Sequence, residues 1–324
     1  MPTASIVIAT YNRASFLDAC LTCLAAQAFE AGDEVLVADN GSTDRTAEVA
    51  ARHAATFPVP LVRIHEGRPG KSHALASALA SASGDIAVFT DDDVEVDTGW
   101  LDALRSALSD PGVDMAGGPV EPHWERTPPF WLRLDPNGYG RLAAPLGLLD
   151  YGPAEQPLGG RTLLGANMAV RRSVLDAAGG FAAHLGKLRG TLLSGEDHEL
   201  CQRIQAAGSV VRYSPEARVR HWVPADRMRL AYFLRWFYWS GITNAAIDAG
   251  SRSARTVLGV PPFLVRQFTR GVCGAAVSAL RGRFATAVDR ALDSAFAVGY
   301  AARMSGLAAR GAGTPGRQQL ARGL

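Results

Sequence analysis

Short apolar runs alternate with helix-forming stretches along the first part of the chain, and this alternation constrains the fold more than any other feature. Four runs rich in β-branched residues have the length of strands, and they cover residues 4–10, 34–40, 61–65 and 85–90. Between them apolar residues recur at helical spacing. Buried strands that alternate with helices of about 10 to 15 residues are typical of a mostly parallel, doubly wound sheet. The sequence therefore predicts a Rossmann-like α/β fold.

The alternation ends near Met115, where proline, glycine and aromatic residues become frequent. Regular structure is predicted again as a strand over 163–171, a helix over 196–207 and a last strand over 210–213. From Leu230 onward the pattern is helical, with a break at two consecutive prolines. We expect one large domain, a helical appendage and a disordered tail, with limits at residues 1–225, 226–310 and 311–324.

The charge of the chain is unevenly distributed. Residues 226–324 hold 14 arginines, 4 aspartates and no lysine, a net charge of +10, whereas residues 1–225 hold 19 basic and 27 acidic side chains, a net charge of −8. This asymmetry favours attraction to an anionic surface, either acidic lipid or nucleic acid. Arginines that pair with acidic groups of the first domain explain it equally well. Because no nucleic-acid-binding module accompanies the charge, we expect no nucleic-acid partner; self-association stays open.

Two segments of the helical region interleave aromatic and aliphatic residues with arginine, Leu230–Trp239 and Val257–Phe268. This composition suits a helix that lies in a membrane interface, and it also suits a helix packed on a protein with its arginines directed outward. No apolar run approaches the roughly 18 to 20 residues that cross a bilayer, and the start of the chain lacks a signal-peptide pattern. With four cysteines only, we expect a cytoplasmic protein, at most peripheral on the inner face of the membrane.

Polar side chains follow each of the four predicted strands. Since ligands of open parallel sheets bind beyond the carboxyl ends of the strands, these side chains should converge on one site. The set combines acidic groups that can hold a metal or ribose hydroxyls with basic groups that can bind phosphate: Thr10, Asn12, Arg13, Asp39, Ser42, Arg68, Lys71, Asp91, Asp92 and Asp93.

Three adjacent carboxylates, Asp91, Asp92 and Asp93, are the most specific feature of this set. In extended backbone Asp91 and Asp93 share a face and Asp92 points the other way. Adjacent carboxylates repel one another unless a cation or strong donors offset the cost, and oxygen ligands favour Mg²⁺ or Mn²⁺. A solvated acidic turn is the plain alternative. Directly after a buried strand, the triplet favours a metal site.

Six segments, in order, resemble the family 2 glycosyltransferases, whose catalytic domain has the GT-A fold. The resemblance covers about residues 4–225, and its segments are SIVIATYNR (5–13), ADNGSTDRT (38–46), GDIAVFTDDDV (84–94), LLGANMAVRR (163–172), GEDHELCQRI (195–204) and RYSPEARVRHW (212–222). It implies an inverting, metal-dependent transferase that uses a nucleoside-diphosphate sugar, a UDP-sugar being favoured, in glycan, polysaccharide or glycolipid synthesis.

The resemblance also implies roles for individual residues. Asp91 and Asp93 form the Asp-x-Asp pair that binds Mn²⁺ or Mg²⁺, and His221 closes the metal site. The donor is bordered by Thr10, Asn12, Asp39, Arg68, Lys71, Asp91, Asp92, Gly165 and Asn167.

Asp197 is the general base by the same resemblance. A carboxylate at a helix N-terminus is kept ionised by the dipole and can accept the proton of an acceptor hydroxyl. From the residues alone, Glu196 and Asp197 are also ordinary residues for a helix start. Trp124 and Trp131, with Glu196, are assigned to the acceptor side because sugars stack on aromatic rings, although packing of the two halves explains the aromatics equally well.

The acceptor is not identified by the sequence, which allows a saccharide or a lipid-linked molecule. One alternative function is transfer to a polyprenyl phosphate, with the arginine-rich region at the membrane surface. The other is a nucleotide-sugar or glycan binding module without catalysis, and the complete set of Asp91, Asp93, Asp197 and His221 argues against it.

Overall fold

The computed structural model describes residues 1–135, 139–182, 192, 195–247 and 261–306, and the chain forms two compact units. The first unit comprises Met1–Arg189 and Gly195–Met228, and most of the second follows from Arg229 onward. The domain limits at residues 1–225 and 226–310 stay predictions. The predicted tail over 311–324 lies outside the described residues.

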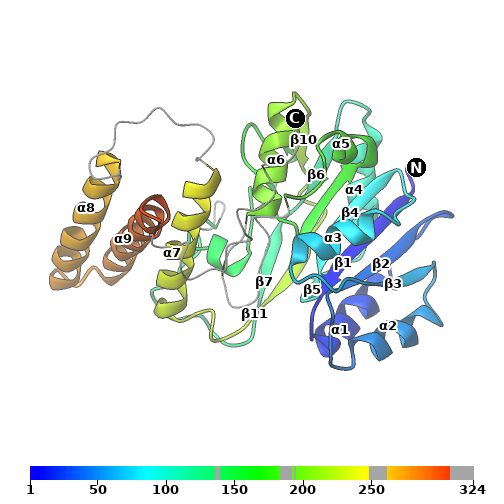
Figure 1. Ribbon diagram of the computed structural model, residues 1–324, viewed down its shortest axis with the longest axis horizontal. Coiled ribbons are helices and arrows are strands. Elements are labelled where there is room, and N and C mark those ends of the chain that lie inside the picture. Colours follow the sequence, from blue (N-terminus) through cyan, green and yellow to red (C-terminus); the bar gives the residue numbers. More distant parts are fainter. Residues whose placement is uncertain (136–138, 183–191, 193–194, 248–260, 307–324) are drawn as a thin grey trace, which may run out of the picture. The chain divides into compact units, whose positions relative to one another are not determined.

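An eight-stranded sheet forms the centre of the first unit, with strand order β3-β2-β1-β4-β9-β6-β10-β8 (Figure 1). The four strands expected from the apolar runs are parallel neighbours: β1 (Ala4–Thr10), β2 (Glu34–Asp39), β3 (Leu61–His65) and β4 (Ile86–Asp91). The next strand, β9 (Asn167–Arg171), is antiparallel to both of its neighbours and makes the sheet mixed. Three short strands complete the sheet: β6 (Met115–Gly117), β10 (Val211–Tyr213) and β8 (Gln156–Pro157).

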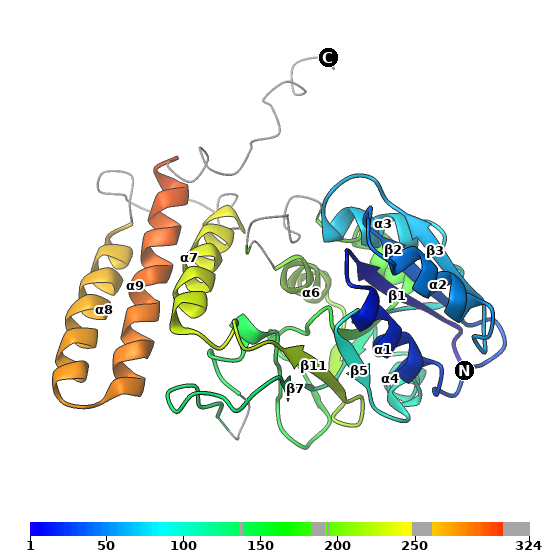
Figure 2. The same ribbon diagram turned by 90° about the horizontal axis from the view of Figure 1, so that it is seen from below.

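Helices cover both faces of this sheet (Figure 2). The first two, α1 (Ala14–Leu24) and α2 (Thr46–Ala54), pack against each other, and α3 (Lys71–Leu79) packs on β1 and β2. Since parallel crossovers are right-handed, the return of the chain past β1 to β4 places α3 on the opposite face from α1. The unit also contains α4 (Trp100–Ser109), α5 (Arg172–Ala177), α6 (Glu196–Ala206) and the 3₁₀ helix η1 (Ala144–Leu146).

A second, three-stranded sheet has the order β5-β11-β7 and places a histidine beside the acidic triplet. Its strands are β5 (Val94–Val96), β11 (Val219–Val223) and β7 (Val120–Trp124). The strand predicted over 210–213 is not the last one, because a further strand, β11, contains His221 opposite Val94. Along β11 the residues Val219, His221 and Val223 are buried in alternation, as in any strand with one covered face.

Three helices form the described part of the second unit: α7 (Leu230–Ile247), α8 (Pro262–Leu280) and α9 (Phe284–Met304). Within this unit α9 packs along both other helices. Glycine allows the close approach of α7 and α9, since a Cβ on Gly299 would lie 1.8 Å from Tyr238 O and one on Gly241 would lie 2.2 Å from Phe296 O. Among the described helices, none is both long enough and apolar enough to cross a bilayer.

Candidate active site

The carboxyl ends of three adjacent strands bring predicted site residues together at one edge of the large sheet. Thr10 lies opposite Asp39 in the pairing of β1 with β2, and Ala9 lies opposite Asp91 in the pairing of β1 with β4. Because ligands of open parallel sheets bind beyond these ends, the convergence expected from the sequence is a property of the strand register.

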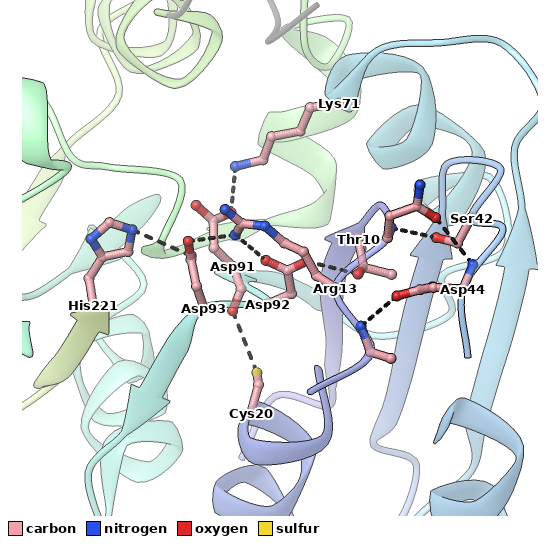
Figure 3. A network of polar contacts seen from close by, with 12 residues as sticks. Thr10, Arg13, Cys20, Ser42, Asp44, Lys71, Asp91, Asp92, Asp93 and His221 are labelled. Atoms are coloured by element: carbon pink, nitrogen blue, oxygen red, sulfur yellow. Dashed lines mark hydrogen bonds and ion pairs between the residues drawn. The ribbon is translucent and has the colours of Figure 1, made fainter. Parts of the chain in front are cut away.

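Arg13 bridges two of the three adjacent aspartates (Figure 3). Its Nη1 donates to Asp92 Oδ1 at 2.9 Å and to Asp93 Oδ2 at 2.6 Å. Thr10 Oγ1 donates to the second carboxylate oxygen of Asp92 at 2.8 Å. Only 4% of Asp92 and 8% of Asp93 is exposed, so both carboxylates need partners to remain ionised. Burial raises the pKa of Asp92 to about 6, although the charge of Arg13 opposes the rise.

The structure differs from the predicted alternation of the triplet. Strand β4 ends at Asp91, and residues 92 and 93 form a turn, so the two-residue period of a strand does not continue. Asp91 contacts Lys71 Nζ, whereas Asp92 and Asp93 share Arg13. The triplet is therefore divided between a lysine and an arginine.

A small pocket connects the triplet to the start of α6. Lys71 and Asp91 line it together with Glu196 and Asp197, and the rest of the lining is Leu75, Phe89, Thr90, Gly165 and Phe181. Burial on its own lowers the pKa of Lys71, but the charges of Asp91 and Glu196 raise it above the usual value. The ammonium group thus stays charged in the pocket.

Asp197 lies in the first turn of α6, and backbone amides orient both of its carboxylate oxygens. Gly165 N donates to Oδ2 and His198 N donates to Oδ1, each at 2.8 Å. The neighbouring Glu196 accepts a hydrogen bond from Gly195 N at 3.0 Å and is 5% exposed. The predicted base and the loop that contains Gly165 therefore lie on the same side of the pocket.

Asn12 and Asp39 hold the loop that follows β2. Asn12 has a left-handed backbone, with φ of 51°, and its Oδ1 accepts a hydrogen bond from Thr43 N at 2.7 Å. Asp39 accepts hydrogen bonds from Ser42 N at 2.9 Å and from Arg63 Nη1 at 2.7 Å. The sequence did not single out Arg63; its one signal was a charged residue inside the predicted third strand.

Arg68 lies at the rim of this region. Its guanidinium forms a two-pronged pair with Glu66, in which Nε lies 3.0 Å from Oε1 and Nη2 lies 2.7 Å from Oε2. Hydrogen bonds from Arg68 and Ser77 lower the pKa of Glu66. With 66% of its side chain exposed, Arg68 is the most solvent-accessible cation among the predicted donor residues.

The side chain of Asn167, one of the predicted donor residues, lies in the core. Its side chain is fully buried, and Trp100 Nε1 donates to its Oδ1 at 2.8 Å. Its Nδ2 donates to Pro119 O at 2.9 Å and to Ala217 O at 2.7 Å. These bonds use the side-chain amide inside the core, so the side chain of Asn167 joins β9 to its surroundings.

The two predicted acceptor tryptophans lie outside the pocket lining. Trp124 is the last residue of β7 and pairs with Val223, and Trp131 is a partly buried residue of the irregular segment after β7. Of the predicted acceptor residues, Glu196 lines the pocket.

His221 faces the carboxylate that is predicted to bind the metal. Its Nε2 lies 3.4 Å from Asp93 Oδ1, the residue is 4% exposed, and its Nδ1 has no hydrogen-bond partner among the described atoms. The ring nitrogen that faces Asp93 is therefore Nε2, and the pair of imidazole and carboxylate could bind one cation. No group of three or more His, Cys, Asp or Glu side chains converges closely enough in the described residues to enclose one by itself.

The family of the chain follows from comparison with known proteins. The family model described as Glycosyl transferase family 2 matches residues 5–179, more than half of the chain, so the chain belongs to this family. It is a glycosyltransferase, as the six sequence segments predicted.

Three curated relatives are similar to this chain over most of its length, and the names of two of them refer to a polysaccharide or a lipid-linked sugar. Glycosyltransferase AglE of Haloferax volcanii is 29% identical over 210 residues, which span 64% of this chain and 63% of that protein. Succinoglycan biosynthesis protein ExoM of Rhizobium meliloti is 28% identical over 75% of this chain and 74% of its own length. The glucosyl-dolichyl phosphate glucuronosyltransferase of Haloferax volcanii is 25% identical, with coverages of 75% and 77%.

Two solved structures show the same fold. The mannosyltransferase PcManGT from Pyrobaculum calidifontis, in complex with GDP-Man and Mn²⁺, superposes with a TM-score of 0.57 at 21% identity and covers 97% of this chain and 76% of that one. GalNAc-T7 with UDP, GalNAc and Mn²⁺ gives 0.53 at 16% identity, with coverages of 78% and 51%. The predicted GT-A-type fold class is confirmed.

Proposed function

We propose that this glycosyltransferase transfers a sugar from a nucleoside-diphosphate sugar to a hydroxyl group, with inversion at the anomeric carbon. The pocket shared by Lys71, Asp91 and Asp197 carries the proposal, because it joins a permanent cation to a carboxylate that can accept a proton. Lys71 can pair with a phosphate, and Asp197 lines the same pocket beside Gly165.

The donor would lie along the carboxyl ends of β1, β2 and β4. Thr10, Asn12 and Asp39 border the nucleotide in this proposal, and Arg68 and Lys71 provide positive charge. Asp91, Asp92 and Gly165 lie nearer the ribose and the sugar. The solved structures with GDP-Man and with UDP support a nucleoside-diphosphate donor, and a UDP-sugar is our first choice.

Asp93, Asp91 and His221 would hold Mn²⁺ or Mg²⁺. The two neighbours solved with Mn²⁺ support this assignment, as does the 3.4 Å separation of His221 Nε2 from Asp93 Oδ1, which would let both groups bind one ion. A divalent ion bound there would neutralise the charge that develops on the leaving diphosphate. One or two carboxylates with substrate phosphates suffice for such an ion, which agrees with the small number of protein ligands at this place.

Asp197 is proposed as the general base. Two backbone amides hold its carboxylate in the pocket, where it can accept the proton of the acceptor hydroxyl as the oxygen attacks the anomeric carbon. Attack from the side opposite the diphosphate inverts the configuration. Glu196 contributes negative charge beside Lys71 and, with Trp124 and Trp131, is assigned to the acceptor side.

The acceptor is a saccharide or a lipid-linked molecule in this proposal. The dolichyl-phosphate relative favours a lipid-linked acceptor, and a polyprenyl phosphate is the second candidate. We place the reaction on the cytoplasmic side of the membrane, since all four cysteines are free thiols and Cys273 is exposed, as a reducing compartment allows.

A screen of nucleotide sugars by thermal unfolding, with and without Mn²⁺, tests the donor. A ligand that binds only the folded state raises the unfolding temperature, so one donor class should stabilise the protein and do so more strongly with Mn²⁺. Transfer from that donor to lipid-linked and soluble acceptors, with the product configuration read by NMR, then tests catalysis. Stabilisation without transfer to any acceptor would favour the binding module.

A further inference from the structure

The outward side of α8 and the turn that follows it expose an unusual number of large apolar side chains. Of the fourteen such side chains exposed in the described residues, seven fall between residues 263 and 284. Leu280, at the end of α8, is 88% exposed. The seven are Phe263, Val265, Phe268, Val272, Val277, Leu280 and Phe284. This density exceeds the scattered apolar exposure of an ordinary protein surface.

The contacts of α8 with α9 define which side of the helix is free. Leu264 is 1% exposed, and a Cβ on Gly271 would lie 2.2 Å from Ser294 Oγ, so these two residues face α9. At 100° per residue, Val265, Val272 and Leu280 fall within a sector of about 80°, and Leu264 and Gly271 lie outside it. These three apolar side chains therefore form a band along α8 that is directed away from α9. Phe263 lies outside this band, since its ring contacts Tyr300 of α9 with the centroids 6.3 Å apart.

Arginines border this band, and no acidic residue accompanies them. Residues 261–288 contain four basic side chains and no aspartate or glutamate, and the four are Arg266, Arg270, Arg281 and Arg283. All four are exposed. The next acidic residue along the chain is Asp289. An apolar band beside uncompensated positive charge complements a lipid surface, in which an apolar interior lies beneath anionic headgroups.

The structure also changes which segment is the candidate for this contact. The sequence indicated two segments, Leu230–Trp239 and Val257–Phe268. In the first, Phe233 is fully buried and Phe237 is 7% exposed, so these rings of α7 belong to the protein interior. The first residues of the second predicted segment, Val257–Phe268, lie outside the described residues. The exposed apolar side chains are on α8, mostly beyond that segment.

We infer that the outward face of α8 and the α8–α9 turn bind the surface of an anionic lipid bilayer. The apolar side chains enter the headgroup boundary, and Arg266, Arg270, Arg281 and Arg283 meet the lipid phosphates. A second copy of the chain fits this face less well, because a two-fold dimer places the same arginines of both copies against each other. Membrane binding would bring the enzyme to a lipid-linked acceptor, and in this respect the inference rests on the proposed function. The binding test itself does not require catalysis.

Flotation of the purified full chain with vesicles tests the inference. Binding is expected to vesicles of phosphatidylcholine with phosphatidylglycerol, to weaken as salt rises, and to be absent with phosphatidylcholine alone. R266Q with R270Q should weaken partitioning roughly thirtyfold, and Leu280→Ser with Phe284→Ser should weaken it by at least about tenfold. Val62→Ser and Arg45→Gln, exposed changes of the same kind in the first unit, are the matched controls and should bind like the wild type.

Three results would overturn the inference. They are failure to bind either kind of vesicle, equal loss of binding in the Val62→Ser and Arg45→Gln controls, and a dimer that becomes monomeric on Leu280→Ser when followed by light scattering. The Asp197→Asn variant must still bind the vesicles. Lipid binding and glycosyl transfer are measured separately, so failure of the proposed function leaves this outcome unchanged.

Discussion

The two units of the chain contain different kinds of energetically unfavourable groups. The first unit buries charge, as Asp92, Asp93 and His221 show at the strand ends, whereas α8 in the second unit exposes apolar side chains such as Val272 and Leu280. Both arrangements cost free energy in the isolated protein. Such costs are commonly retained where a ligand offsets them, and the difference therefore indicates a polar ligand for the first unit and an amphipathic one for the second.

Not every buried charge in the first unit marks a site. Arg105 and Asp33 form a pair in which both side chains are fully buried, and Arg105 Nη1 also donates to Ala28 O at 3.0 Å. This pair does not belong to the lining of the pocket at the strand ends. The acidic triplet differs because its first residue, Asp91, lines a pocket together with Lys71.

Removal of a buried charge from the triplet should have the largest effect. Asp93→Ala is expected to lower transfer by at least about a thousandfold and to weaken nucleotide binding in Mn²⁺, since the carboxylate would hold the ion that offsets the diphosphate charge. Steady-state kinetics and calorimetry measure both. The control is Asp97→Ala, which removes a carboxylate that is 41% exposed and weakly paired, since its Oδ1 lies 3.7 Å from Arg220 Nε. Undiminished turnover in excess chelator would contradict the prediction.

Asp197→Asn should have the next largest effect and separates the base from the scaffold. Transfer is expected to fall by roughly a hundredfold while the donor dissociation constant stays near that of the wild type, because only the proton acceptor is lost. Glu199→Gln is the control, since Glu199 lies in the same turn and pairs with Arg203. Equal losses of binding and rate would instead give Asp197 a purely structural role.

The fold could be predicted where the chain is buried on both sides. The runs that became β1, β2 and β4 are apolar and of strand length, so their residue types alone predict burial. The edge strand β3 is the exception, because Val62 and Arg63 are exposed and the strand was predicted from its length and β-branched residues. The short strand β11 was missed because it is five residues long and contains Arg220 and His221, which dilute its apolar pattern. In the large sheet, β9 begins at Asn167 rather than Leu163, since residues 163–166 form a loop.

The site could be predicted only as a set of residue types at strand ends. Strand register explains why Thr10, Asp39 and Asp91 converge, and that much follows from a parallel sheet. The sequence could not show that Asp92 and Asp93 lie in a turn and share Arg13. It also could not show that Asn167 is turned into the core, because that depends on contacts with distant residues.

Substitution of Arg13 should have a smaller effect, and it tests whether Arg13 competes with a metal ion for the buried carboxylates of Asp92 and Asp93. Arg13→Gln should tighten Mn²⁺ binding in the absence of donor by about tenfold, because the guanidinium now bound to Asp92 and Asp93 repels an incoming cation and must give up charge-assisted hydrogen bonds. Titration calorimetry measures the affinity. Arg45→Gln is the control, because Arg45 is 79% exposed and pairs only weakly with Glu48. Unchanged or weaker Mn²⁺ binding would show that Arg13 does not oppose the metal.

The smallest expected effect on transfer comes from disturbing the second unit. A Cβ on Gly299 would lie 1.8 Å from Tyr238 O, so Gly299→Val forces α7 and α9 apart and should destabilise their packing by about 1–3 kcal/mol. Transfer to a soluble acceptor should stay within about twofold of the wild type, since the strand-end residues belong to the first unit. Scanning calorimetry measures the loss of stability, and Val298→Ala, an exposed change at the adjacent position, is the control. Loss of donor binding in Gly299→Val alone would mean that the two units fold together, and the contrast between them would then describe surfaces of one cooperative structure.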